Sequence, residues 1–159
     1  MSILDPRVRA AIDSLGIECE ELACDPELAD TAKFCEHYGI PLANACNTII
    51  VVLKTNPRQY VGCLVTGDSR IDVNHRVSAI VGVKRLSFAN AEETKELTGM
   101  MIGGVTVLGL PEGMPLLIDR RVLDRDWVIV GGGNRSSKVR LDPRALEKIP
   151  GARVEEIAQ

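Results

Sequence analysis

Aromatic side chains and histidines are scarce in this sequence of 159 residues, which has one Trp, two Tyr, two Phe and two His. Because aromatic residues make up 3% of the chain and hydrophobic residues 45%, we expect a core of aliphatic side chains. His37 and His75 have no third partner at the spacing of metal ligands. We therefore expect no metal site and no cofactor.

The chain also lacks close cysteine pairs such as C-x-x-C and long apolar runs. An odd number of widely spaced cysteines, with no signal peptide, is typical of reduced thiols in a cytoplasmic protein. No apolar run approaches the roughly 18 residues that cross a bilayer. These absences predict a cytoplasmic protein whose five cysteines are unpaired: Cys19, Cys24, Cys35, Cys46 and Cys63.

A basic excess is absent as well, since the net charge is −3. This value argues against an extended basic surface that binds nucleic acid regardless of its sequence. Locally the balance differs, because residues 119–144 contain seven basic residues and four Asp. This segment is either a small patch for the end of a nucleic acid or an ordinary charged surface.

The length predicts one domain spanning residues 1–159. Capping signals begin helices at Asp5-Pro6, Asp30, Asp72, Asn90 and Asp142. The β-branched run 47–53 predicts a buried strand that pairs with residues 60–65. Further strands are expected at 105–108, 114–118, 127–130 and 138–141. Helices early and strands late in the chain indicate the α+β class.

Two glycine segments are candidate site elements. Gly103-Gly104 precedes a predicted strand, and Gly131-Gly132-Gly133 precedes the polar run 134–138. Without a Cβ, such backbone can approach a ligand closely, although a tight turn or hairpin would have the same composition. The second segment is not a Walker A loop, because Ser137 stands where that motif needs glycine before the lysine.

The order of these segments, with Asp119 ending an apolar run between them, resembles the YbaK family of aminoacyl-tRNA editing domains. That resemblance implies a mixed, largely antiparallel sheet bent into a partial barrel with surrounding helices. It also implies a hydrolase that cleaves the ester of mischarged tRNA, with partners in the tRNA acceptor end and an aminoacyl-tRNA synthetase. The implied catalytic positions are Asn47, Gly103, Gly104 and Asp119. The implied substrate-binding positions are Thr106, Gly132, Gly133, Asn134, Arg135 and Ser136.

Two positions depart from the family pattern. Asn47 stands where the family usually has a lysine, and Val107 stands where it has a proline. The first hypothesis is therefore a deacylase acting in trans on mischarged tRNA, tRNA-Pro among the candidates. The alternative is a non-catalytic module of the same fold that binds a tRNA end or a synthetase. A thiol redox or metal protein is disfavoured by the cysteine spacing.

Overall fold

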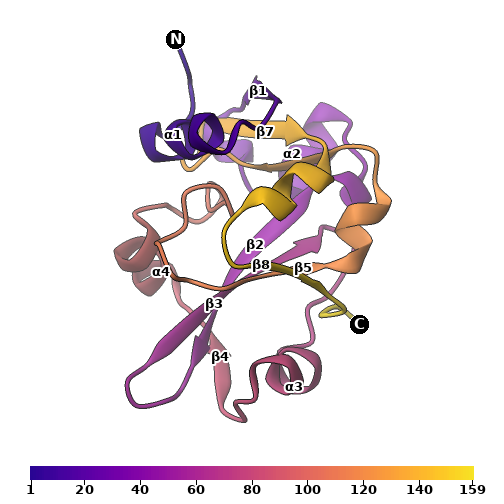
Figure 1. Ribbon diagram of the computed structural model, residues 1–159. Coiled ribbons are helices and arrows are strands. Elements are labelled where there is room, and N and C mark those ends of the chain that lie inside the picture. Colours follow the sequence, from indigo (N-terminus) through magenta and orange to yellow (C-terminus); the bar gives the residue numbers. More distant parts are fainter.

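Two sheets form the protein in the computed structural model, which describes residues 1–159 (Figure 1). In the larger sheet, of order β4-β2-β3-β5-β8, β2 (Cys46–Leu53) pairs antiparallel with β3 (Gln59–Thr66) and β4 (Leu86–Phe88). β5 (Leu116–Asp119) runs parallel to both β3 and β8 (Ala152–Glu155). The sheet is thus mixed, as the resemblance implied.

The smaller sheet is antiparallel, with β7 (Ser137–Leu141) between β1 (Cys19–Ala23) and β6 (Val128–Gly131). A single parallel bridge between Ala45 and Ile129 joins it to the larger sheet. The sheets therefore do not close into a barrel, and the predicted partial barrel is better described as two sheets with one junction. This junction positions the site described below.

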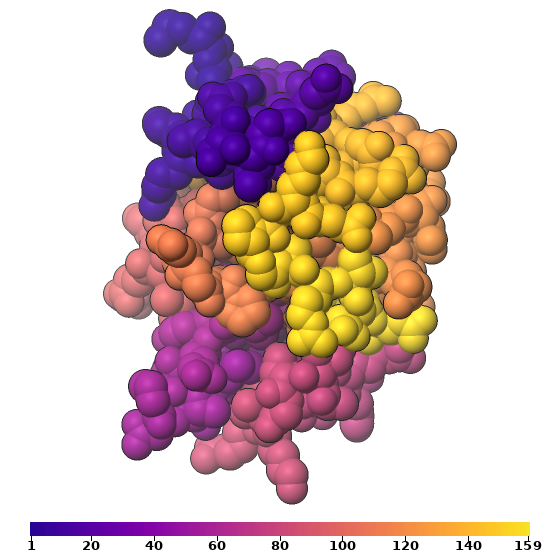
Figure 2. Space-filling view, in the orientation of Figure 1, coloured from indigo at the N-terminus to yellow at the C-terminus, as the bar shows by residue number.

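Helix α1 (Pro6–Leu15) shows how the sequence specifies local structure. The Asp5 carboxylate accepts a hydrogen bond from the Arg7 N–H, Pro6 occupies the first turn, and Gly16 ends the helix with φ at 66°. Val8 and Ile12 are buried. They pack in one core cluster with residues of both sheets and with Leu146 from the C-terminal segment. Helix α1 and the segment around Leu146 lie side by side on one face as a result (Figure 2).

The other helices are short. They are α2 (Thr31–Tyr38), α3 (Ser78–Val81) and α4 (Ala91–Thr98), and a π-helical turn precedes α3 at Val73–Val77. Single 3-10 segments occupy Pro26–Leu28, Leu42–Asn44, Arg120–Asp124 and Pro143–Lys148. None of these helices has the length and apolar character needed to span a bilayer.

One predicted strand was wrong. Residues 105–108 form no strand but a turn-rich loop, in which the Thr106 hydroxyl accepts a hydrogen bond from the Leu108 N–H at 3.3 Å. Gly103 and Gly109 flank this loop, each with φ at 91°. A short polar side chain that bonds its own backbone competes with a sheet ladder, and positive φ on both sides interrupts extended structure.

Candidate active site at the junction of the two sheets

A cavity of about 310 Å³ lies at the junction of the two sheets, and we call it the junction cavity. One wall is the start of β2, residues 46–49. The facing wall comes from the 102–105 loop and from Gly131 and Lys138 at β6 and β7. Asp30 and Thr31 at the start of α2 complete it. Five elements far apart in the sequence thus contribute to one hollow.

The two predicted glycine segments do meet at this cavity. A Cβ on Gly104 would lie 2.4 Å from the Asn134 carbonyl oxygen, and one on Gly131 would lie 2.6 Å from the Val105 oxygen. Such distances are far below ordinary contact, so only glycine allows the two backbones to pack. The Gly133 N–H donates to the Gly104 carbonyl at 2.8 Å and fixes this arrangement.

The glycine N–H groups are only partly free for a ligand. The Gly104 N–H donates to the Met101 carbonyl at 2.8 Å, and the Gly132 N–H donates to the Ser137 carbonyl at 3.2 Å. Of the glycines predicted as site residues, only Gly103 lines the junction cavity. Gly104, Gly132 and Gly133 shape the wall behind it.

The polar residues predicted after Gly133 hold the 131–137 loop in place. The side-chain oxygen Oδ1 of Asn134 accepts from the Ser137 hydroxyl at 2.7 Å and from the Ser136 N–H at 3.1 Å. Arg135 donates to the carbonyls of Pro26 at 3.0 Å and Ile102 at 2.6 Å, and its guanidinium lies 3.3 Å from the Asp30 carboxylate. Arg135 therefore connects residues around the junction cavity, although its own side chain does not line the cavity.

Asn47 lines the junction cavity from β2, and its side-chain oxygen accepts a hydrogen bond from the Thr31 hydroxyl. The side chain is neutral and half-buried. Next to it, the buried Thr48 hydroxyl has no hydrogen-bond partner in the protein. This wall can form hydrogen bonds but contributes no charge.

Lys138 supplies a charge from the opposite wall, which the sequence reasoning did not identify. Its side chain is only 6% exposed, and Nζ donates to the carbonyl oxygens of Ala29 at 2.6 Å and Gly103 at 2.9 Å. The Phe34 ring centroid lies 5.4 Å from Nζ, within cation–π range. Burial lowers the pKa of Lys138 below its ordinary 10.5.

A sequence signal for Lys138 existed but was ambiguous. Alternation along β7 places Lys138 and Arg140 on the same face of the strand, opposite Val139 and Leu141. Arg140 is exposed and stacks on Trp127 at 4.1 Å, whereas Lys138 is buried. The pattern alone does not distinguish the two cations, because the residues that cover Lys138, among them Ala29, Phe34 and Gly103, come from distant parts of the chain.

Asp119 and Thr106 lie elsewhere. Asp119 is buried, and one carboxylate oxygen accepts the N–H groups of Ile157 at 2.9 Å and Ala158 at 3.0 Å. The other oxygen accepts the Arg121 N–H at 3.1 Å and caps the following 3-10 turn. Neither Asp119 nor Thr106 lines the junction cavity. Both carboxylate oxygens of Asp119 thus bind backbone N–H groups of the protein, and its suggested contact with substrate stays a prediction.

The cysteine in the cavity wall is a protonated thiol at neutral pH. Burial raises the pKa of Cys46 to about 12, with a smaller contribution from Asp68. Because the thiolate is the nucleophilic form, Cys46 is unsuited to nucleophilic catalysis. All five cysteines are free.

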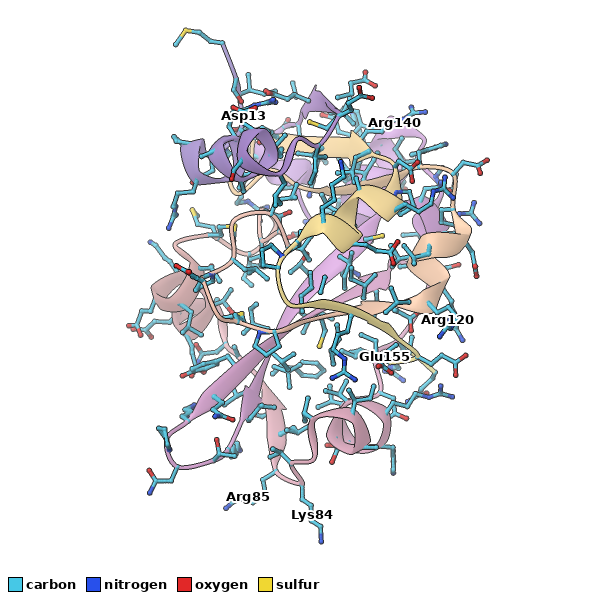
Figure 3. The ribbon with its side chains drawn as sticks, viewed as in Figure 1. Asp13, Lys84, Arg85, Arg120, Arg140 and Glu155 are labelled. Atoms are coloured by element: carbon cyan, nitrogen blue, oxygen red, sulfur yellow. The ribbon has the colours of Figure 1, made fainter.

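The seven basic residues of segment 119–144 do not form one patch. Arg121 donates to Gln159 and Ser69, Arg125 to Asn44, and Arg144 pairs with Asp142. Arg120 and Arg140 project from separate parts of the surface (Figure 3).

Known proteins share this architecture. The solved structure of the protein APE2540 superposes with a TM-score of 0.86 at 28% identity, covering 96% of this chain and 99% of that one. A second structure, described as that of a proposed trans-editing enzyme for prolyl-tRNA synthetase, has a TM-score of 0.84 at 24% identity and covers 98% and 99% of the two chains. At this identity the second match shows the fold.

Sequence comparison leads to the same group. EbsC of Enterococcus faecalis, whose name proposes a Cys-tRNA(Pro)/Cys-tRNA(Cys) deacylase, is 22% identical over 138 residues, which are 86% of this chain and 82% of that protein. The family model of the aminoacyl-tRNA editing domain matches residues 25–149, a range that contains every residue lining the junction cavity. The chain therefore belongs to the aminoacyl-tRNA editing domain family.

Proposed function

We propose that this protein is an aminoacyl-tRNA deacylase that acts in trans and hydrolyses the ester between a wrongly attached amino acid and the terminal ribose of tRNA. The observation that carries the proposal is the junction cavity, whose lining residues all lie within the range that the editing-domain family model matches. Its volume of about 310 Å³ is at the small end of ligand pockets. It suits one aminoacyl group with part of its ribose.

The selectivity follows from pocket size. Ile49, Ile102 and Val105 give the junction cavity apolar surface, while Asn47, Thr31 and Lys138 give it polar groups. An apolar pocket distinguishes one methylene by about 1–3 kcal/mol, which is why a second, editing site is useful after a synthetase has made an error. A small side chain is the expected substrate of such a cavity.

We further propose tRNA-Pro as the tRNA, in view of the names that the relatives carry. EbsC is named for Cys-tRNA(Pro) and Cys-tRNA(Cys), and the fold is shared with a protein named for prolyl-tRNA synthetase. A prolyl-tRNA synthetase would be the partner whose errors this protein removes. A synthetase partner would also explain how a chain of net charge −3 acts on tRNA without a broad basic surface.

The test is deacylation of alanyl-, cysteinyl- and seryl-tRNA-Pro by the purified protein, with prolyl-tRNA-Pro as the cognate control. We expect hydrolysis of at least one mischarged species and none of the cognate one. If no aminoacyl-tRNA in a complete panel is hydrolysed, the deacylase proposal fails. Binding of tRNA or of a synthetase at low salt would then favour the non-catalytic module, for which the neutral Asn47 is the supporting observation.

A further inference from the structure

We propose that Lys138 is a catalytic residue of this protein, whose ammonium group donates a hydrogen bond to the carbonyl oxygen of the substrate ester and stabilises the oxyanion formed there. The inference rests on the proposed deacylase function and deepens it. It places the positive charge of the active site on β7, at a residue that the sequence analysis did not predict as a site residue.

The geometry leaves one donor of Lys138 free. An ammonium group has three N–H bonds, and two of them donate to the carbonyls of Ala29 and Gly103. Lys138 also lines the junction cavity, so the remaining N–H is available to a bound group. The two carbonyls and the Phe34 ring hold Nζ in place before any substrate arrives. Such preorganisation is what makes a donor effective in a transition state.

No other cation can fill this role. Lys138 is the only basic side chain among the residues that line the junction cavity. Arg135, the nearest alternative, already donates to Pro26 and Ile102 and pairs with Asp30. Asn47 is uncharged, and its side-chain oxygen is occupied by Thr31.

Lys138 also has no direct ion-pair partner. No carboxylate lies within 4.0 Å of Nζ, although the side chain is almost completely buried. The Asp30 carboxylate, which lines the same cavity, pairs with Arg135 and acts on Lys138 only at longer range. Burying a charge without an opposite charge costs free energy, and a neutral side chain could bridge two carbonyls at lower cost. A negative charge that develops in the junction cavity during the reaction would be the missing counterpart. This interaction strengthens as the reaction proceeds, which is the requirement for catalysis.

The chemical step is an ordinary ester hydrolysis. The oxygen of a water molecule forms a bond to the ester carbon while the carbonyl π electrons move onto the carbonyl oxygen, where the Lys138 N–H stabilises them. The electrons then return, the bond to the ribose oxygen breaks, and that oxygen takes up the proton lost by the water. The products are the free amino acid and the tRNA with its terminal hydroxyl, and Lys138 keeps its proton throughout.

The experiment compares single-turnover deacylation by the wild type, K138Q and K138A on the mischarged tRNA that the wild type hydrolyses best. Gln carries no charge, and its shorter side chain does not bring a donor to the place of Nζ. We therefore expect the rate constant of K138Q to fall about 10²–10³-fold, the usual effect of losing one oxyanion donor. The apparent tRNA affinity should change by less than about threefold, because the lost interaction forms in the transition state and not in the bound substrate. K84M is the matched control, because Lys84 is exposed and projects from the opposite end of the molecule (Figure 3).

Small amines separate a catalytic role from a structural one. Ethylammonium should raise the rate of folded K138A in proportion to its concentration, because it can enter the space left by the side chain, and should leave the wild type and K84M unchanged. A K138Q rate within about threefold of the wild type overturns the proposal. So does a folded K138A that does not respond to amines. If the wild type hydrolyses no aminoacyl-tRNA, the deacylase function itself fails.

Discussion

The two facing walls of the junction cavity are built in different ways. The wall from β2 is a regular strand, paired with β3 on one side and with β4 further along, and its cavity-lining residues are uncharged. The opposite wall combines the 102–105 loop with the ends of strands β6 and β7. The loop packs backbone to backbone against β6 and the segment after it, at Gly104 and Gly131, and β7 contributes Lys138. The regular wall gives shape and neutral hydrogen bonds, and the irregular wall gives the charge.

This difference shows that a cation in the junction cavity can come from either wall. Asn47 lies on β2 at a position where the resembling family usually has a lysine, yet the junction cavity does contain a buried ammonium group. Two strands that are more than eighty residues apart in sequence face the same space, so either can place a charge there. From the residues of β2 alone, one would conclude that the junction cavity contains no positive charge.

Replacing Asp119 by alanine should lower the stability more than any other change and leave turnover unchanged. That result would support the view that the reacting groups lie only on the two walls of the junction cavity. The buried N–H groups of Ile157 and Ala158 would lose their acceptor. Each unsatisfied donor costs about 1–3 kcal/mol, so the free energy of unfolding should fall by roughly 2–5 kcal/mol. Urea unfolding measures this, with the exposed Asp124→Ala as control. A loss of turnover in folded D119A would place Asp119 back among the catalytic residues.

Replacing Gly104 by alanine should break the irregular wall. Its Cβ would meet the Asn134 backbone at 2.4–2.8 Å, so the two loops must separate and Gly103, an acceptor for Lys138, moves with them. We expect kcat/KM to fall about 100-fold, as for a catalytic group misplaced by about 1 Å. The free energy of unfolding should fall by about 1–3 kcal/mol. The exposed Asp124→Ala serves again as the control, because every glycine with open space around it has positive φ, where alanine would itself be strained. Unchanged activity in G104A would mean that the loop packing does not position the reacting groups.

The pH profile should report the charge on the irregular wall. Burial lowers the pKa of Lys138 and Arg135 adds to this, while the thiols of Cys24 and Cys35 and the Asp30 carboxylate oppose it. Because the protonated form is required, turnover should fall as pH rises through this lowered pKa, below the range of an ordinary lysine near 10.5. Rates are measured from neutral pH upward, corrected for uncatalysed ester hydrolysis. In K138Q, turnover should no longer fall over this alkaline pH range. If the fall persists in K138Q, another group causes it.

The smallest effect is expected on the regular wall. Asn47→Ala removes a neutral hydrogen-bonding group, typically worth about 0.5–1.5 kcal/mol, so the rate constant should fall only about 2–10-fold. The comparison with K138Q, measured on the same tRNA, tests the assignment of roles directly. A loss in N47A as large as that in K138Q would show that both walls share the chemistry.

Local signals predicted the regular parts of the fold well. The strands expected at 47–53 and 60–65 appear as Cys46–Leu53 and Gln59–Thr66, because β-branched runs and the intervening turn specify them locally. The predicted cap at Asn90 is present, with its side chain accepting the Glu93 N–H at 2.8 Å. By contrast, β8 and β4 escaped prediction. Ala152–Glu155 is polar and half-buried, and it is a strand because β5 offers it a parallel edge.

The predicted site residues do not all lie together. Both glycine segments and Asn47 do meet at the junction cavity, but Asp119, Thr106 and Asn134 bind the protein's own backbone. A short polar side chain at the end of a strand or in a loop has the same sequence signature whether it binds a ligand or caps a turn. Its partner is determined by which donors the fold brings near, and these lie up to 39 positions away.

The sequence by itself determined the helix caps, the central hairpin of β2 and β3, the aliphatic core and the family, since these depend on neighbouring residues and on composition. Only the tertiary structure decided which polar groups face the junction cavity. Lys138 and Arg140 are equivalent in the pattern of their strand, and one becomes a buried cation because the 102–105 loop and the segment of Ala29 and Phe34 pack over it. Burial of a charge depends on what covers it, and what covers Lys138 comes from segments 35 and 109 residues away.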